Sequence, residues 1–210
     1  MDLIVDTSRK GIRMFVCGVN AANENVEREL VKTDARSEKL ENLLDELLSS
    51  VNAALENVKR VLVLCGPGSF TGLRTGIAFC EGLCFSGKRE LYGVSSLKAF
   101  TTFANSTPVV ITKARPGFWY YSENTENSGE YFWSTEQVVK ALANVTATEA
   151  VLDDNAVVCA DIANAIAAKN IAVVKESEGS LASLRKVFDW GLKPSPVQDA
   201  NYIQPSYAEQ

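Results

Sequence analysis

The stretch CGPGSFTGLRTGIAF, residues 65–79, is the densest glycine cluster in this chain of 210 residues. A short apolar run, residues 61–65, leads into it, and a segment with helical character follows. This order predicts a buried strand, a glycine turn and a helix, which is the layout of many phosphate-binding loops. The stretch therefore poses a choice between a nucleotide cradle and a turn built for packing.

The glycine spacing fits neither of two common nucleotide motifs. Counting from Gly66, the second glycine of a Walker A loop falls on Thr71, and the lysine that should follow is missing. A dinucleotide fingerprint fails at the same residue, because its third glycine also falls on Thr71. The expected strand before the loop is moreover the fourth of the chain, whereas that fingerprint follows the first.

The same glycines suit close approach of two backbones. Gly66–Gly68 provide a tight turn, and either Ser69 or Thr71 can cap the helix that follows. Gly72 and Gly76 lie one helical turn apart and leave one helix face nearly without side chains. Internal packing and a partner interface explain this bare face about equally well.

Composition narrows the class of protein. With 46% hydrophobic and 22% charged residues, the chain has the balance of a soluble globular protein. A net charge of -5 argues against broad binding to naked nucleic acid, which needs a basic surface. The five cysteines form an odd set without a CxxC pair, so we expect free thiols and a reducing cytoplasm.

The chain contains no histidine. This excludes Ser-His-Asp and Cys-His catalysis and histidine-based zinc hydrolysis. Catalysis would have to use carboxylates, lysine or a cofactor. The first residues show no signal peptide, and no apolar run is long enough to span a bilayer, so we expect a cytoplasmic protein away from membranes.

The first half of the chain predicts the element order βββαβαβα. The expected strands are residues 3–6, 12–19, 26–33, 60–65 and 90–94, of which the first three form an antiparallel meander and 60–65 is a central parallel strand. The expected helices are residues 37–58, with Ser37 as N-cap and a wide leucine stripe, 70–86 and 95–104.

The second half gives a weaker pattern. Strands are expected at 108–112, 118–123, 130–134, 156–160 and 171–175. A capping box at Ser134 and Gln137 opens a helix to about residue 144, and further helices are expected at 161–169 and 180–192 before an irregular tail. We expect two domains, an N-terminal lobe over 1–106 and a smaller, divergent C-terminal lobe over 107–210.

Several segments together resemble one known family. GPGSFTGLRTGIAFCEGL at 66–83, LIVDTS at 3–8 and GVSSL at 93–97 are similar to the TsaB, or YeaZ-like, family, which takes part in making threonylcarbamoyladenosine in bacterial tRNA. TKARPGFWYYSE at 112–123 and ANYIQPSY at 200–207 resemble further family segments. The resemblance implies an α/β, two-lobed actin/hexokinase-like ATPase (ribonuclease H-like) fold, with a mixed sheet and flanking helices in each lobe.

The resemblance also implies a function. A TsaB-like chain is expected to be a non-catalytic subunit that binds and activates TsaD through its N-terminal helices, in the complex that modifies position 37 of tRNA. Further expected partners are TsaE in the larger complex, a second copy when the chain is alone, and tRNA only through the complex. The alternative is an independent ATPase or kinase-like nucleotide-binding protein of the same superfamily.

The resemblance carries over to two groups of residues. The implied partner interface comprises Leu40, Leu44, Leu47, Phe70, Thr71, Gly72, Arg74, Thr75, Gly76, Phe79 and Cys80. The residues expected near a nucleotide are Asp6, Thr7, Ser8, Gly66, Gly68 and Ser69. No tightly bound cofactor and no metal site are expected, although ATP or ADP with Mg²⁺ could sit at the partner interface.

Some residues depart from the family pattern. Arg9 and Lys10 follow Asp6 where a glycine is usual, which favours a structural turn there over a phosphate loop. Arg36, Lys113 and Gln204 stand where the family often has histidine, aspartate and arginine. These changes put the nucleotide contacts in question more than the helices expected to form the interface.

Overall fold

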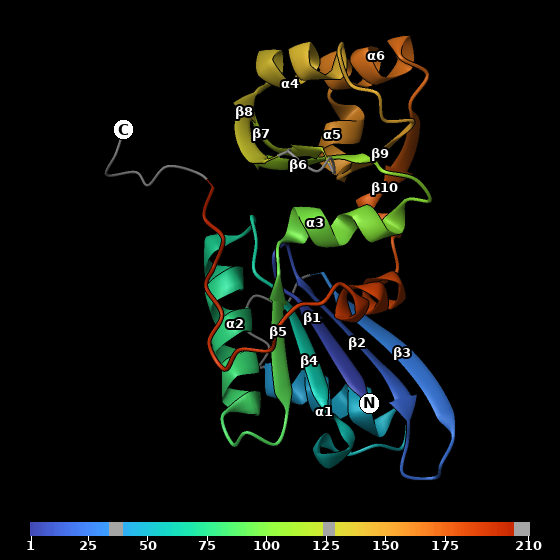
Figure 1. Cartoon of the computed structure of the whole chain (residues 1–210), viewed down its shortest axis with the longest axis vertical. Coiled ribbons are helices and arrows are strands. Elements are labelled where there is room, and N and C mark those ends of the chain that lie inside the picture. The colour runs from blue at the N-terminus through green and yellow to red at the C-terminus, as the bar shows by residue number, and fades with distance from the viewer. Residues whose placement is uncertain (34–39, 124–128, 204–210) are drawn as a thin grey trace. The chain divides into compact units, whose positions relative to one another are not determined.

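The computed structural model describes residues 1–33, 40–123 and 129–203, which form two compact units (Figure 1). The first unit comprises Met1–Ser96 and Leu184–Asn201. The second comprises Leu97–Ser183 together with the described residues Tyr202 and Ile203.

The first unit is built on a mixed sheet of five strands in the order β3-β2-β1-β4-β5. The strands are β1 Asp2–Asp6, β2 Ile12–Val19, β3 Asn25–Lys32, β4 Arg60–Leu64 and β5 Glu90–Val94. The first three pair antiparallel as a meander, while β4 pairs parallel with both β1 and β5. The predicted meander and the central parallel strand are confirmed.

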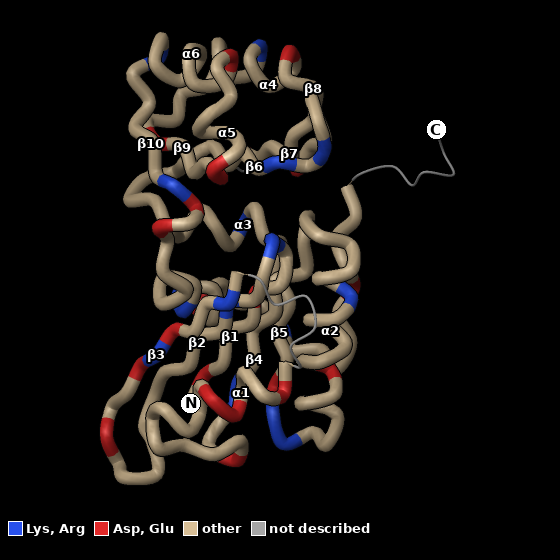
Figure 2. The backbone as a smooth tube through the Cα atoms, turned by 180° about the vertical axis from the view of Figure 1, so that it is seen from behind, with Lys and Arg blue, Asp and Glu red and all other residues tan. Residues whose placement is uncertain are grey.

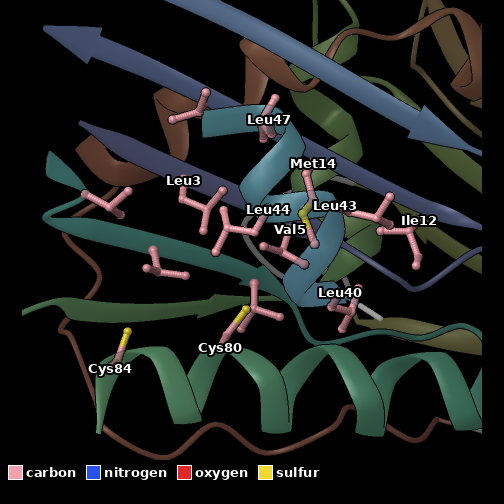
Figure 3. Close-up of a cluster of buried hydrophobic side chains, with 14 of the residues drawn as sticks. Leu3, Val5, Ile12, Met14, Leu40, Leu43, Leu44, Leu47, Cys80 and Cys84 are labelled. Atoms are coloured by element: carbon pink, nitrogen blue, oxygen red, sulfur yellow. The ribbon is translucent and has the colours of Figure 1, made fainter. Parts of the chain in front are cut away.

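Two helices pack on one face of this sheet, α1 Leu40–Ser49 and α2 Phe70–Cys84. Leucines of α1 and cysteines of α2 meet the inward side chains of β1 and β2 in one buried cluster (Figure 3). The helix predicted to reach residue 58 ends at Ser49, since Asn52 has a positive φ of 51° and a 3₁₀ turn follows at Leu55–Asn57. The predicted N-cap Ser37 lies outside the described residues.

The second unit repeats this topology. Its strands are β6 Val109–Arg115, β7 Phe118–Glu123, β8 Glu130–Ser134, β9 Glu149–Leu152 and β10 Ala172–Lys175. Their order, read from the third strand of the meander, is β8-β7-β6-β9-β10, which matches the first sheet strand for strand. The pairing β6–β9 and β9–β10 is parallel, as in the first unit. The two-lobed fold predicted from the sequence is confirmed.

The remaining helices are short. They are α3 Ser96–Phe100 with a 3₁₀ turn at Thr101–Phe103, α4 Thr135–Leu142, α5 Asp154–Val158, α6 Ala160–Ala168, and the 3₁₀ helices Glu176–Glu178 and Leu181–Asp189. The capping box that opens α4 is present as predicted. No helix within the three described ranges has both the length and the hydropathy needed to cross a membrane.

Two expectations for the second half are wrong. Residues 156–160 were expected to form a strand, but most of them lie in α5, because the buried Asp153 accepts a hydrogen bond from the backbone N–H of Ala156 at 2.8 Å and caps a helix. Strand β9 was not predicted, because its four residues, EAVL, carry too little pattern to distinguish a strand from a helix.

The compact units differ from the predicted lobes at two places. Residues 97–106 belong to the second unit, and Leu184–Asn201 return to the first. The return is anchored by Phe188, whose ring meets Tyr92 edge-on at 5.3 Å and accepts the Arg60 guanidinium on its face at 4.3 Å. Arg60 is itself held by a two-pronged ion pair with Asp2.

Candidate functional site

The glycine turn is fixed from two sides within the first unit. Ser96 donates its backbone N–H to the Gly66 carbonyl at 2.7 Å, and its hydroxyl accepts from the Gly66 N–H. On the other side, the N–H of Ser69 donates to the carbonyl of Ser8 at 2.8 Å. The hydroxyl of Ser69 accepts from the Gly72 N–H, so Ser69 is the N-cap of α2.

The bare glycine face of α2 packs against the turn that follows β1. A Cβ atom at Gly68 would come closer than 3.0 Å to the Ser8 carbonyl, and one at Gly72 or Gly76 would come equally close to atoms of Thr7. Real Cβ atoms do not approach this closely, so only glycine allows α2 to lie here. The glycine face serves packing within the first unit, which favours the packing interpretation over the docking one.

Five residues of the predicted partner interface are buried within the first unit. The side chains of Leu40, Leu44, Leu47 and Cys80 are buried in the core of the first unit, and Gly76 is buried against Thr7. None of these five residues can contact a partner without unfolding the core. The leucine stripe of α1 is therefore explained by packing on the sheet.

The other predicted interface residues lie on the outer side of α2. Thr71, Arg74 and Thr75 are exposed, and Phe70 is 58% exposed. The two exceptions are half-buried: Gly72 faces Thr7, and Phe79 packs against the core of the first unit. The outer side also includes Ala78, Gly82 and the 91% exposed Phe85, which were not among the predicted interface residues. The α2 face, as used below, comprises Phe70, Thr71, Arg74, Thr75, Ala78, Gly82 and Phe85.

The α2 face has an unusual composition for an exposed helix surface. Its one exposed charged residue is Arg74, whose guanidinium lies over the Phe70 ring at 5.4 Å. The half-buried Glu81 lies on the same side of the helix. Small residues occupy the middle, and a phenylalanine stands at each end. In Figure 2 most of α2 is accordingly tan, whereas charged segments alternate along β3. The signal in the sequence was the lack of charges between Arg74 and Glu81, at positions that a helix turns outward.

The residues expected near a nucleotide are brought together, and several of their polar groups are used internally, although Oδ2 of the buried Asp6 has no hydrogen-bond partner among the described residues. Asp6, Thr7 and Ser8 are buried, and Oδ1 of Asp6 accepts from both the N–H and the hydroxyl of Ser8. The Thr7 hydroxyl donates to the Gly72 carbonyl at 2.8 Å. The backbone donors of Ser69 and Gly72 are likewise taken. In this arrangement the residues fit a packed turn and offer a phosphate few donors.

The buried thiols of the first unit are held neutral. Burial raises the pKa of Cys65 to about 11, and it raises the pKa of Cys80 well above its ordinary value. A neutral thiol is a poor nucleophile and a poor metal ligand. In the parts of the chain that the structure describes, no three His, Cys, Asp or Glu side chains gather in a way that could hold a metal ion.

The second unit holds a cavity of about 270 Å³ between residues 106–109 and 145–148, with Glu123 at its wall. None of the predicted site residues lines this cavity. Of the residues that depart from the family pattern, Lys113 places its ammonium over the Trp119 ring at 4.4 Å and donates its backbone N–H to Asp153. Arg36 and Gln204 lie outside the described residues.

Comparison with known proteins gives consistent matches. Residues 31–151, more than half of the chain, match the family model of TsaD, tRNA N6-adenosine threonylcarbamoyltransferase. The TsaB protein of Escherichia coli, named for tRNA threonylcarbamoyladenosine biosynthesis, is 27% identical over 66% of this chain and 62% of its own length. An uncharacterized Mycobacterium tuberculosis protein is 29% identical over 81% of this chain and 76% of its own.

Solved structures share the fold. A Pseudomonas aeruginosa protein described as similar to the peptidase YeaZ superposes with a TM-score of 0.68 over 97% of this chain and 99% of its own, at 17% identity. YeaZ from the same organism gives 0.62 over 98% of each chain, also at 17% identity. The chain therefore belongs to the TsaD, or tRNA N6-adenosine threonylcarbamoyltransferase, family, and is a TsaB-like member of it.

Proposed function

We propose that this chain acts in tRNA threonylcarbamoyladenosine biosynthesis as a subunit that docks on TsaD through the α2 face. The observation that carries the proposal is a helix with one side packed in its own core and an outer side that exposes two phenylalanines, with Arg74 and the half-buried Glu81 as its charged residues. A helix that is apolar on most of its circumference is usually covered on both sides. Names of the TsaB relatives support the pathway.

The centre of the α2 face suits a second helix. Thr71, Thr75, Ala78 and Gly82 follow one another at spacings of three and four residues, so they line one side of α2. Their small side chains let another backbone come close, and Phe70 and Phe85 can then fill the space at each end. In this proposal TsaD performs the chemistry and contacts the tRNA, and TsaE joins the larger assembly.

The test is the affinity of the purified chain for TsaD of the same organism. Ala78→Arg places a long charged side chain at the centre of the α2 face and should weaken binding by at least about tenfold, because the charge would be buried without a partner. The matched control is Ala167→Arg, at an exposed position of α6 in the second unit, which should leave the affinity unchanged. Absence of binding by the wild-type chain would overturn the proposal.

The alternative function, independent nucleotide hydrolysis, makes a separate prediction. We propose that the chain alone does not turn over ATP, because the donors around Asp6–Ser8 are engaged within the turn. Phosphate release should stay at the background level when the purified chain is incubated with MgATP. Turnover that disappears in Asp6→Ala would favour the ATPase.

A further inference from the structure

The chain returns to α2 after its last helix. The segment Lys193–Asn201, called the strap below, runs without regular secondary structure past β5 and along α2 (Figure 1). Its backbone is tied at three points: Ser195 N–H donates to the Leu91 carbonyl of β5 at 2.9 Å, and Asn201 N–H donates to the Cys65 carbonyl at 2.7 Å. Between them, the N–H of Gln198 donates to a carboxylate oxygen of Glu81 on α2 at 2.9 Å.

The first unit contains a seat for the strap. A Cβ atom at Gly93 of β5 would come closer than 3.0 Å to the side-chain amide of Gln198, so the glycine leaves the space that this side chain occupies. The amide of Gln198 donates to the carbonyls of Ser195 and Leu91. Gly93 therefore leaves room for the Gln198 side chain and for the thiol of Cys65, which follows the neighbouring strand β4.

One side chain of the strap points outward. Val197 is 65% exposed, although its backbone is held on both sides by the Ser195 hydroxyl. Five large hydrophobic residues of the described first unit are this exposed or nearly so, and three of them, Phe70, Phe85 and Val197, lie on α2 and the strap. The other two, Val19 and Val31, lie on β2 and β3.

The strap lies beside α2 near its Phe85 end. Glu81, which binds the residue next to Val197, lies one helical turn before Phe85 on the same side of α2. The strap therefore holds an exposed apolar residue, Val197, next to the one that binds this part of α2. An ordered apolar residue beside such a face adds to binding at little further entropic cost, because its backbone is already fixed.

We propose that the strap is a second part of the docking surface, adding Val197 to the α2 face and holding α2 through Glu81. Its occupant is the same TsaD subunit, and the inference rests on the proposed function. The partner surface that fits is an apolar helix face broad enough to cover α2 and reach the strap. A second copy of this chain is the competing occupant.

The experiment compares two valines in the full-length chain. Val197→Asp should weaken the affinity for TsaD by about tenfold or more, since it places a charge in the contact. Val31→Asp, at a 52% exposed valine on β3, is the matched control and should change the affinity by less than about twofold. Circular dichroism and the melting temperature should be the same for both variants and the wild type.

A second variant tests the holding role. Gln198→Ala empties the seat at Gly93 and should increase hydrogen exchange of the strap and of α2 near Glu81, together with a smaller loss of affinity. Equal affinities for Val197→Asp and Val31→Asp, with the wild type binding, would overturn the strap proposal alone. A wild-type chain that fails to bind overturns the proposed function as well. Loss of self-association in Val197→Asp without loss of TsaD affinity would assign the strap to a second copy instead.

Discussion

The packing of α2 against the turn after β1 depends on the absence of a side chain at Gly76. A Cβ atom there would collide with the Thr7 side chain, whose hydroxyl is committed to the Gly72 carbonyl. We expect Gly76→Ala to lower the free energy of unfolding by about 1–3 kcal/mol, because α2 must move away from the turn after β1. Urea denaturation measures this change.

The control lies on the same helix. A Cβ atom at Gly82 meets nothing within 4 Å, so Gly82→Ala should leave stability unchanged or raise it by about 0.5–1 kcal/mol, as expected for replacing glycine in a helix. If the two alanines had the same effect, the close approach at Thr7 would not be what requires glycine.

Cys65 gives a prediction for stability against pH. Burial raises the folded-state pKa of this thiol from 9.0 to about 11, so its neutral form is favoured by folding. Its contribution to stability is complete below the unfolded-state pKa and is lost as the pH rises from about 9 to 11. The free energy of unfolding should therefore fall more steeply over this range in the wild type than in Cys65→Ala, by about 1–3 kcal/mol. Parallel curves would contradict a buried neutral thiol.

A substitution in helix α1 can test whether its leucines stabilise the core or bind a partner. Leu47 is fully buried, so Leu47→Ala should cost about 2–5 kcal/mol of stability by leaving a cavity in the core. Asn42→Ala, on the exposed side of α1, should change stability by less than about 0.5 kcal/mol. A Leu47→Ala variant that keeps its stability but loses affinity for TsaD would return α1 to the interface.

Elements with a local signal were the ones that the sequence predicted well. Ser134 caps α4 as predicted, and Ser69, one of the two predicted candidates, caps α2; both caps act through contacts within three residues. The end of α1 was placed too late because Leu55 and Val58 continue the apolar spacing beyond Ser49. Packing on the sheet, not periodicity, determines where that helix stops.

The candidate site depended on contacts that the sequence does not reveal. The spacing of Gly72 and Gly76 predicted a helix face without side chains. Whether that face packs internally depends on Thr7, which lies 65 positions before Gly72 and contacts it only in the folded chain. The outer side of α2 could have been found from its missing charges. The strap could not, because its contacts join Gln198 to Glu81 across 117 positions.

The two units repeat one topology, yet they divide the chain unequally. The first unit needs Leu184–Asn201 to be complete, although the sequence up to β5 already contains its whole sheet. The pattern of strands and helices predicts both meanders, because their strands are contiguous, but it misses the parallel strand β9 of the second unit. The pattern does not predict that residues 184–201 return to the first unit, because this return depends on single contacts such as that of Phe188 with Tyr92.

This division predicts an uneven response to truncation. A chain that ends at Ser183 loses the buried Leu184 and Val187 and the Phe188 contacts with Tyr92 and Arg60, all of which belong to the first unit. We expect amide hydrogen exchange in β4 and β5 to become faster, while β6, β7 and β9 keep their protection. Phe188→Ala in the full chain should also make amide hydrogen exchange in β4 and β5 faster, but by a smaller amount.

Tryptophan fluorescence gives the control for the second unit. Because Trp119 and Trp133 lie in the second unit, their fluorescence should remain native-like in the truncated chain. Faster exchange confined to β6–β9 would instead assign residues 184–201 to the second unit.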